Sequence, residues 1–195
     1  MDLAADMALA LDIAGEVDAF TLPHFVDREF SVDWKQNATL RDSSEVTEID
    51  RRAERMIVDR LTSDRPEHAA FGEEHGLGGS TDSPWRWVID PIDGTSGFVR
   101  GIPVWATLIA LTHADRGAVL GVVSAPALHR RWWGGAGLGA YVAADGITRE
   151  MHVSTVAELA EAQVSVTHSR GWDELGLTGA LVGLQQRARR SRGFG

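Results

Sequence analysis

The chain has 195 residues, which is enough for one sizeable domain with a buried core. Apolar residues make up 44% and charged residues 24%, as in an ordinary soluble globular protein. A net charge of -9 argues against general nucleic-acid binding, and the absence of Cys excludes disulfides and thiolate zinc sites. The acidic N-terminus is unlike a signal peptide, and no apolar run approaches the roughly eighteen residues needed to span a membrane. We therefore expect a cytoplasmic protein without a membrane or nucleic-acid partner.

The first part of the chain shows helical spacing. Apolar residues recur at intervals of three and four over residues 3–17, which predicts an amphipathic helix that ends before Pro23. The polar and irregular stretch that follows contains one candidate strand, around residues 29–32.

A second helix and a strand are expected next. Thr47 has the character of a helix N-cap, and Asp50 follows three residues later, as in a capping box. The apolar stripe that follows predicts a helix to about Leu61. The short apolar run 69–71 then predicts a strand that ends in the acidic loop Gly72-Glu73-Glu74.

Short strands dominate the rest of the predicted structure. Residues 78–83 are small and polar, which predicts a flexible connection, and residues 85–89 form the next strand. Residues 105–111 and 119–123 are rich in β-branched residues and predict a β-hairpin. The remaining predicted elements are strands at 131–133, 140–142, 151–153 and 163–166, and helices at 154–159 and 178–189.

The most chemically informative stretch is Trp87-Val88-Ile89-Asp90-Pro91-Ile92-Asp93-Gly94-Thr95. It begins like a buried strand and then places two carboxylates three residues apart. Mg²⁺ takes oxygen ligands, and several converging carboxylates make a good site for it. Asp90 and Asp93 are therefore candidate metal ligands, together with Glu73 at the end of a neighbouring strand. The intervening Pro can aim the carbonyl of Ile92 at the same space.

The residues after these carboxylates suggest phosphate binding and water activation. Gly94 permits close backbone approach, and amides around Gly94 and Thr95 can bind phosphate oxygens if a helix begins there. A Thr95 hydroxyl bonded to a carboxylate would orient a water, and Asp50 is the candidate because it lies in the first turn of its helix. Each feature also has a simpler explanation, as turn chemistry at Asp90, a solvated acidic loop at Glu73 and a helix cap at Asp50.

Together, the segments 46–50, 72–74 and 87–95 resemble the signature of the inositol monophosphatase family. The resemblance runs from the first helix to the end of the chain. It implies an α+β fold, a layered α/β sandwich of the sugar-phosphatase type. It also implies Mg²⁺-dependent hydrolysis of small phosphate monoesters with two or three ions. The implied metal ligands are Glu73, Asp90, the carbonyl of Ile92 and Asp93; the implied water-activating residues are Asp50 and Thr95; and the implied substrate-binding residues are Asp93, Gly94 and Thr95.

Two further segments narrow the resemblance. Residues 98–108 and 121–133 are similar to the histidinol-phosphatase branch of the family found in actinobacteria. This similarity implies hydrolysis of histidinol phosphate in histidine biosynthesis, with inositol 1-phosphate or another sugar phosphate as the alternative substrate. It also implies a homodimer for full-length members.

The sequence departs from the family pattern at three places. Ser96-Gly97-Phe98 stands where the family has an Asn just before the Phe, and Leu40 stands near a position where the family often has a Lys. The family also has a late Trp-Asp motif whose Asp binds metal, whereas this chain ends at Gly195. Trp172-Asp173 comes too early to replace that motif and is interpreted as a surface loop. We expect one domain over residues 1–195, incomplete at its C-terminus, and an inactive fragment with residual metal binding is the alternative of another class.

Overall fold

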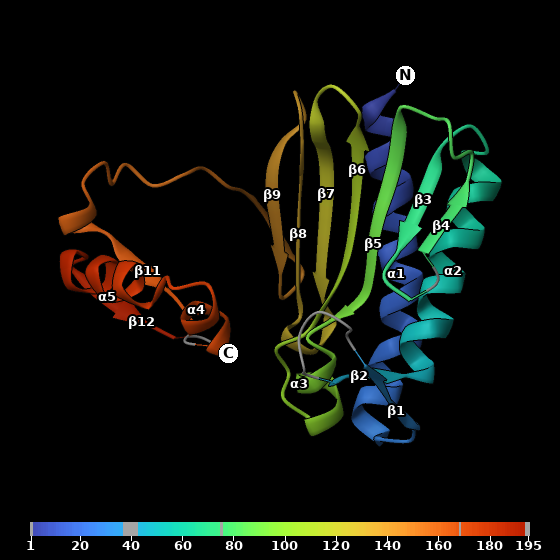
Figure 1. The fold of residues 1–195 in the computed structure, drawn as a ribbon. Helices are drawn as coiled ribbons and strands as arrows, with labels where there is room; N and C mark the ends of the chain where they lie inside the picture. The colour runs from blue at the N-terminus through green and yellow to red at the C-terminus, as the bar shows by residue number, and fades with distance from the viewer. Residues whose placement is uncertain (1, 37–42, 75, 168, 194–195) are drawn as a thin grey trace. The chain divides into compact units, whose positions relative to one another are not determined.

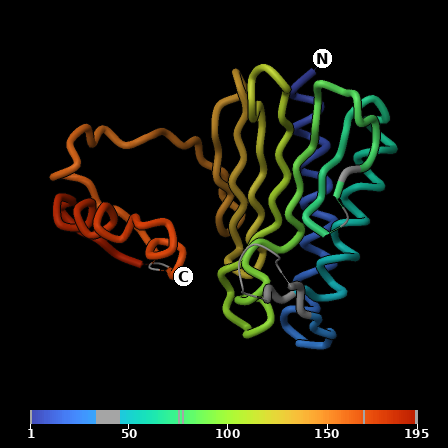
Figure 2. Tube along the Cα trace, in the orientation of Figure 1, coloured from blue at the N-terminus to red at the C-terminus, as the bar shows by residue number. Residues whose placement is uncertain are grey.

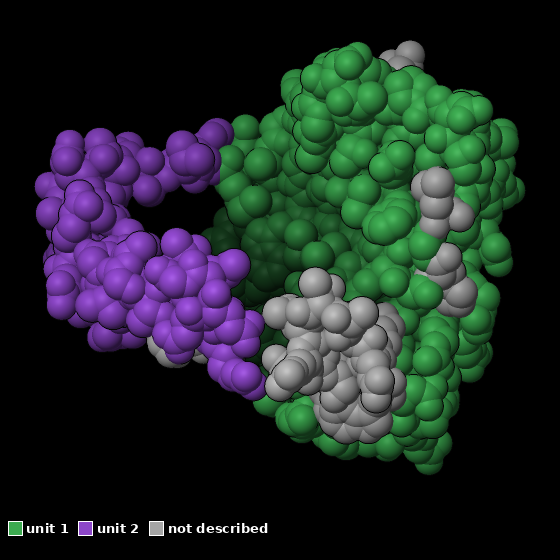
Figure 3. Space-filling model, in the orientation of Figure 1, with its two compact units in different colours: residues 1–151 green, residues 152–195 purple. Residues whose placement is uncertain are grey.

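The structure is a computed structural model, which describes residues 2–36, 43–74, 76–167 and 169–193. Its internal contacts divide the chain into two compact units, Met1–Met151 and His152–Gly195 (Figure 3). The sequence predicted a single domain over residues 1–195, and this stays a prediction. None of the helices within the described ranges is long and apolar enough to cross a membrane.

Two long helices form one layer of the first unit. α1 spans Leu3–Asp27 and begins at Asp2, whose Oδ1 accepts hydrogen bonds from the first free amides of the helix. α2 spans Glu48–Asp64. The capping box predicted for α2 is confirmed, because the side chains of Thr47 and Asp50 each accept a hydrogen bond from the other residue's amide.

The predicted end of the first helix is wrong, because Pro23 lies inside α1. A Pro removes one helical hydrogen bond and strains the turn before it. Packing compensates here, since Phe25, beyond the Pro, lies 5.5 Å from both Phe98 and Trp105, measured between ring centroids. Burial of these rings holds the last turn in the helix against the local preference of the sequence.

An eight-stranded sheet forms the second layer of this unit (Figure 1). Its strand order is β10-β9-β8-β7-β6-β5-β3-β4, with β3 and β5 parallel and the other neighbours antiparallel. The hairpin predicted from the sequence is confirmed as β6 and β7. The strands are β3 (Ala69–Gly72), β4 (Gly76–Gly79), β5 (Trp85–Asp93), β6 (Ala106–His113), β7 (Gly117–Ala125), β8 (Arg130–Gly135), β9 (Gly139–Ala144) and β10 (Ile147–Glu150).

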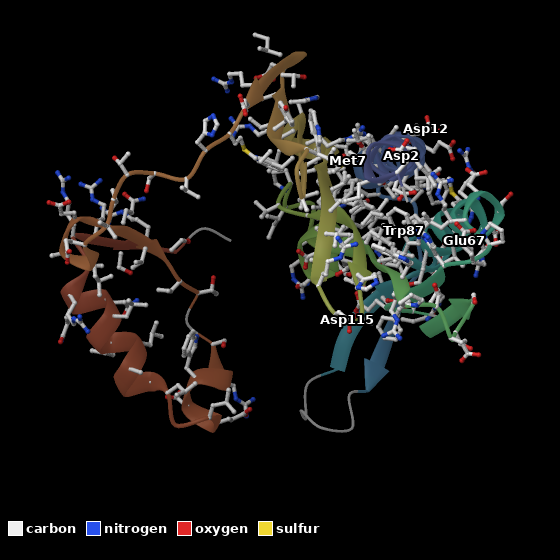
Figure 4. The ribbon with its side chains drawn as sticks, turned by 90° about the horizontal axis from the view of Figure 1, so that it is seen from above. Asp2, Met7, Asp12, Glu67, Trp87 and Asp115 are labelled. Carbon is white, nitrogen blue, oxygen red and sulfur yellow. The ribbon has the colours of Figure 1, made fainter. Side chains whose placement is uncertain are left out.

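The main core lies between this sheet and the two helices. Trp87 of β5 is fully buried and points into the space between α1, α2 and the sheet, where Met7 of α1 also lies (Figure 4). Ile109 of β6 belongs to the same cluster. Alternate side chains of a strand face opposite sides of the sheet. Val88 of β5 and Val123 of β7 point away from the helices, and each is 38% exposed.

Because one face of the sheet is buried and the other is partly exposed, shortening a side chain should affect stability unequally on the two faces. Ile109→Ala should lower the free energy of unfolding by about 2–5 kcal/mol, because it leaves a cavity in a packed core. Val123→Ala, on a neighbouring strand but facing away from the helices, should lower it by less than about 1 kcal/mol. Urea unfolding of the two variants measures the difference, and equal losses would place the core elsewhere.

A smaller apolar cluster surrounds the central motif. It consists of Ile49, Ile92, Phe98 and Trp105, with the rings of Phe98 and Trp105 packed edge to face at 4.9 Å. α3 (Thr95–Arg100) carries Phe98 and contacts β2. Figure 2 shows α3 at the same end of the sheet as the start of α2. The strands β1 (Val32–Gln36) and β2 (Ser43–Thr47) pair antiparallel at this end.

Several short elements differ from the sequence prediction. The strand predicted at 29–32 is displaced to β1, and β2 and β4 were not predicted. The strand predicted at 151–153 is wrong, because the last strand of the sheet is β10. Asp145 and Gly146 have φ values of 51° and 79° and join β9 to β10 as a two-residue turn. This Asp-Gly pair is a strong hairpin signal that the sequence interpretation overlooked. The helix predicted at 154–159 is also wrong, since only a short 3₁₀ turn, Leu159–Glu161, is present near it.

The second unit is a small βαβ arrangement. Its strands β11 (Gln163–Ser165) and β12 (Arg190–Arg192) pair in parallel, and α4 (Arg170–Glu174) and α5 (Thr178–Arg187) lie between them in sequence. The predicted strand at 163–166 and helix at 178–189 are thus confirmed apart from their ends. The surface loop predicted at Trp172-Asp173 is wrong, because both residues belong to α4 and the Asp173 carboxylate accepts a hydrogen bond from the Thr178 hydroxyl.

Candidate active site

Strand pairing brings Glu73 beside Asp90. β3 and β5 are parallel, with Phe71 opposite Val88 and Gly72 opposite Ile89. Glu73 directly follows Gly72 at the end of β3, and Asp90 directly follows Ile89 in β5. Because Phe71 and Val88 face away from the helices, the same alternation directs Glu73 and Asp90 to that face. Glu73 and Asp90 thus lie side by side, but the predicted position of Asp90 at a strand end is wrong, because Asp90 lies within β5.

A β-bulge shapes the rest of the motif. The pairing of β5 with β6 shifts between Asp90 and Asp93, so β5 holds one extra residue there. The Thr107 hydroxyl donates a 2.9 Å hydrogen bond to the carbonyl of Pro91 and fixes this irregularity. As a result Ile92 is buried in the smaller apolar cluster, while Asp93 is exposed. The strand was predicted to end at Ile89, but β5 continues through the motif to Asp93.

Asp90 is electrostatically strained. Burial, the negative charges of Glu73 and Asp93, and a hydrogen bond shared with the Glu73 carboxyl raise the pKa of Asp90 to about 7. The hydrogen bond from the Ile92 amide offsets this only in part. Asp90 Oδ1 is buried and has no hydrogen-bond partner, which is unfavourable for a carboxylate oxygen.

These residues fit a divalent cation. Within the described ranges, no three His, Asp or Glu side chains are already grouped as ligands of one ion. The hydrogen bond between Glu73 and Asp90 nevertheless requires a proton between two carboxylates, and a cation would replace that proton and give Asp90 Oδ1 a partner. Asp93 is exposed and packing does not fix its rotamer, so its carboxylate is free to turn toward a bound cation.

The strain at Asp90 predicts how stability varies with pH in the metal-free chain. Asp90 has a pKa of about 7 when folded and an ordinary value of 3.8, so the folded chain binds this proton more tightly. The contribution of Asp90 to stability is therefore complete below about pH 4, is lost as the pH rises toward 7, and is level above that. Urea unfolding at about pH 5 and about pH 8 should show this loss, and Asp90→Asn should reduce it. An equal loss in the variant would contradict the assignment to Asp90.

Gly94 and Thr95 begin a helix, as phosphate binding by their amides would require. Gly94 has φ 88° and is the N-cap of α3. A Cβ at Gly94 would lie 3.0 Å from the carbonyl oxygen of Val104, so both the backbone conformation and the space favour Gly. Thr95 is the first residue of α3, and the Ile92 carbonyl oxygen, at 3.0 Å, is one of two acceptors within reach of its single hydroxyl proton.

Asp50 reaches this site from α2. The Thr95 hydroxyl lies 3.2 Å from Asp50 Oδ1, and Asp50 Oδ2 accepts from both the amide and the hydroxyl of Thr47. Burial raises the pKa of the Asp50 carboxyl, and the hydrogen bonds from Thr47 and Thr95 offset part of that rise. The contact predicted between Thr95 and Asp50 is present, so one carboxylate serves both as a helix cap and as the partner of this hydroxyl.

Sequence reasoning missed two residues at this site. Thr107 anchors the bulge through Pro91, and Glu54 is a fully buried carboxylate on α2. The only sequence signal for Glu54 is its position four residues after Asp50, which places both on one side of a helix. The position of Leu40 lies outside the described residues.

Two cavities lie away from these carboxylates. One of about 480 Å³ lies between α1 and β7–β9 and includes Asp18, Ser124 and Arg131, which are hydrogen-bonded to one another. The other, of about 440 Å³, has an acidic lining that includes Asp2, Asp6, Asp64 and Glu67. Neither is lined by a residue of the central motif.

Comparison with known proteins gives the class of this molecule. The model of the inositol monophosphatase family matches residues 3–191. The match, together with the layered fold, defines a phosphoric monoester hydrolase. The chain belongs to the inositol monophosphatase family, whose members are generally metal-dependent.

Curated relatives and solved structures agree with this assignment. The chain is 42% identical over 191 residues to the histidinol-phosphatase of Mycobacterium tuberculosis, covering 97% of this chain and 71% of that protein. It is 40% identical to the histidinol-phosphatase of Streptomyces coelicolor, covering 100% and 72%. The crystal structure of extragenic suppressor protein suhB from Bartonella henselae matches with a TM-score of 0.80 and 26% identity, covering 98% of this chain and 70% of that one.

Proposed function

We propose that this protein is an Mg²⁺-dependent phosphatase that hydrolyses histidinol phosphate to histidinol and phosphate. The observation that carries the proposal is the strained carboxylate pair, Asp90 and Glu73, beside a Thr95 hydroxyl that is bonded to a buried Asp50. The choice of substrate is supported by the similarity to two histidinol-phosphatases over nearly the whole chain. The homodimer implied by the family resemblance and the cytoplasmic location stay predictions.

The proposed roles follow from the chemistry of each group. Glu73, Asp90, Asp93 and the carbonyl oxygen of Ile92 would hold two or three Mg²⁺ ions, which are hard cations that prefer such oxygens. When bound, Mg²⁺ supplies charge stabilisation to the phosphoryl group and to the leaving oxygen. Asp93, with the amides at Gly94 and Thr95, would position the substrate phosphate.

Thr95 and Asp50 would move the proton of the attacking water. The water oxygen bonds to phosphorus while the ester P–O bond breaks. The water passes a proton to Thr95 Oγ1 as this hydroxyl passes its own to Asp50 Oδ1, and the departing alcohol oxygen is protonated from solvent. The raised pKa of Asp50 suits this task, because a carboxylate with a higher proton affinity is a better general base.

A phosphate-release assay on the full chain tests this proposal. Histidinol phosphate and inositol 1-phosphate are compared at equal concentration, each with Mg²⁺ and with a chelator. We expect Mg²⁺-dependent release, with kcat/KM for histidinol phosphate at least about tenfold higher, which corresponds to about 1.4 kcal/mol of transition-state stabilisation. A preference for inositol 1-phosphate would transfer the proposal to that substrate class. No release with either substrate would favour an inactive chain with residual metal binding.

A further inference from the structure

Glu54 is a fully buried carboxylate for which the proposed chemistry has no role. It lies on α2 one turn after Asp50, and none of its surface is exposed. Burial of a carboxylate is strongly unfavourable unless hydrogen bonds compensate for the lost water. Glu54 Oε2 accepts a 2.7 Å hydrogen bond from the backbone amide of Glu74. Its charge is therefore directed away from its own helix and into the loop that follows β3.

Gly72 shows how closely Glu54 packs under this loop. A Cβ added at Gly72 would lie 2.2 Å from Glu54 Cδ and 2.3 Å and 2.6 Å from the two carboxylate oxygens. A side chain at this position would require the buried Glu54 carboxylate to move. Gly72 is not among the described glycines with positive φ, so the constraint on this position comes from the space taken by Glu54. Gly72 thus leaves room for the buried carboxylate beneath the loop.

Gly72 and Glu74 are the two neighbours of Glu73. We propose that Glu54 is a positioning residue that holds Glu73 beside Asp90 by fixing the backbone on both sides of it. α2 packs against β3 (Figure 1), and the same helix carries Asp50 one turn earlier. One helical segment therefore sets the place of a proposed metal ligand and of the proposed proton acceptor. The consequence for metal binding rests on the proposed function, whereas the contact itself does not.

Glu54 acts from the opposite side of the sheet to the metal ligands. The Cβ direction of Gly72 points at Glu54 and so toward α2. Side chains alternate along a strand, so Glu73 is directed to the other face. Glu54 is accordingly a support for the loop and contributes no oxygen to the ion.

Two substitutions separate the hydrogen bond from the charge. Glu54→Gln keeps the size and an acceptor oxygen, while Glu54→Ala removes the acceptor and leaves the Glu74 amide without it. Ile57→Val, in the next turn of α2, is the control for loss of packing. Ile57 is as fully buried as Glu54, but its side chain has no atom that could accept the Glu74 amide hydrogen bond.

The first measurement is hydrogen exchange of the Glu74 amide by NMR in the metal-free full chain, relative to a core amide of β7. We expect exchange at least about tenfold faster in Glu54→Ala, and within about threefold of wild type in Glu54→Gln and Ile57→Val. Unchanged exchange in Glu54→Ala overturns the proposal, whether or not the chain binds metal.

The second measurement is the Mn²⁺ affinity of the same proteins by isothermal titration. Glu54→Ala should bind Mn²⁺ about 10- to 100-fold more weakly, as for other residues that orient a metal ligand, and Glu54→Gln should stay within about threefold of wild type. Equal loss in both variants would show that the charge is required and would overturn the positioning role. Absence of binding in the wild type would refute the proposed function, and amide exchange alone would then decide the role of Glu54.

Discussion

Asp90→Asn should reduce Mg²⁺-dependent phosphate release by a factor on the order of 10³ or more, to near background, because a charged ligand shared by the proposed ions is lost. The fold should survive, since Asn keeps the shape of the side chain and relieves the repulsion from Glu73 and Asp93. In the absence of metal the variant should be at least as stable as the wild type near pH 8. Turnover under saturating Mg²⁺ and urea unfolding measure the two effects.

A matched control for this variant is Asp12→Asn. Asp12 lies on α1, is exposed and pairs with Arg60 at 3.2 Å. Its loss should leave turnover unchanged and alter stability by less than about 1 kcal/mol, as for an ordinary surface ion pair. If Asp90→Asn retained wild-type turnover, or if both variants lost it equally, the assignment of Asp90 would be refuted.

Thr95→Val should lower kcat by about 10²- to 10⁴-fold with little effect on metal affinity. Val keeps the shape of Thr but has no hydroxyl, so the bonds to Asp50 Oδ1 and to the Ile92 carbonyl are lost. Asp50 still accepts two hydrogen bonds from Thr47, so the start of α2 should remain intact. Steady-state kinetics over a range of Mg²⁺ concentrations separates kcat from the half-saturating concentration of the ion.

The control substitution for this second prediction is Thr112→Val. Thr112 lies on β6 and its hydroxyl donates 3.0 Å to the Arg86 carbonyl, near the end of β5 remote from the motif. It should leave kcat unchanged. A shift in Mg²⁺ half-saturation with unchanged kcat in Thr95→Val would instead make Thr95 a support for the ion.

Local signals explain why much of the site could be predicted from the sequence. The capping box at Thr47 and Asp50 depends on residues only three positions apart. Glu73 and Asp90 each follow a short apolar run, which predicts two neighbouring strands, whereas their exact pairing is set by the β3–β5 register. The family resemblance then supplied roles that the individual residues could not, because Asp-x-x-Asp by itself is also turn chemistry.

Features that depend on distant contacts were missed for a physical reason. Pro23 remains helical because Phe25 packs on the rings of Phe98 and Trp105. No local sequence pattern near Pro23 predicts that contact. The burial of Glu54 depends on a glycine eighteen residues later in the chain. The bulge at Asp90 depends on a hydrogen bond from Thr107. By contrast, the turn at Asp145-Gly146 carried a local signal and could have been found.

The central claim is that the carboxylates of the motif bind a divalent cation, and paramagnetic broadening by Mn²⁺ tests it most directly. The NMR amide signals of the ¹⁵N-labelled full chain are followed at substoichiometric Mn²⁺ near pH 8. The amide signals of Glu73, Asp90 and residues 92–95 should broaden first, and Asp90→Asn should abolish this selectivity. Broadening centred instead on the acidic cavity at Asp6 and Glu67, or spread evenly over the surface, would contradict the account.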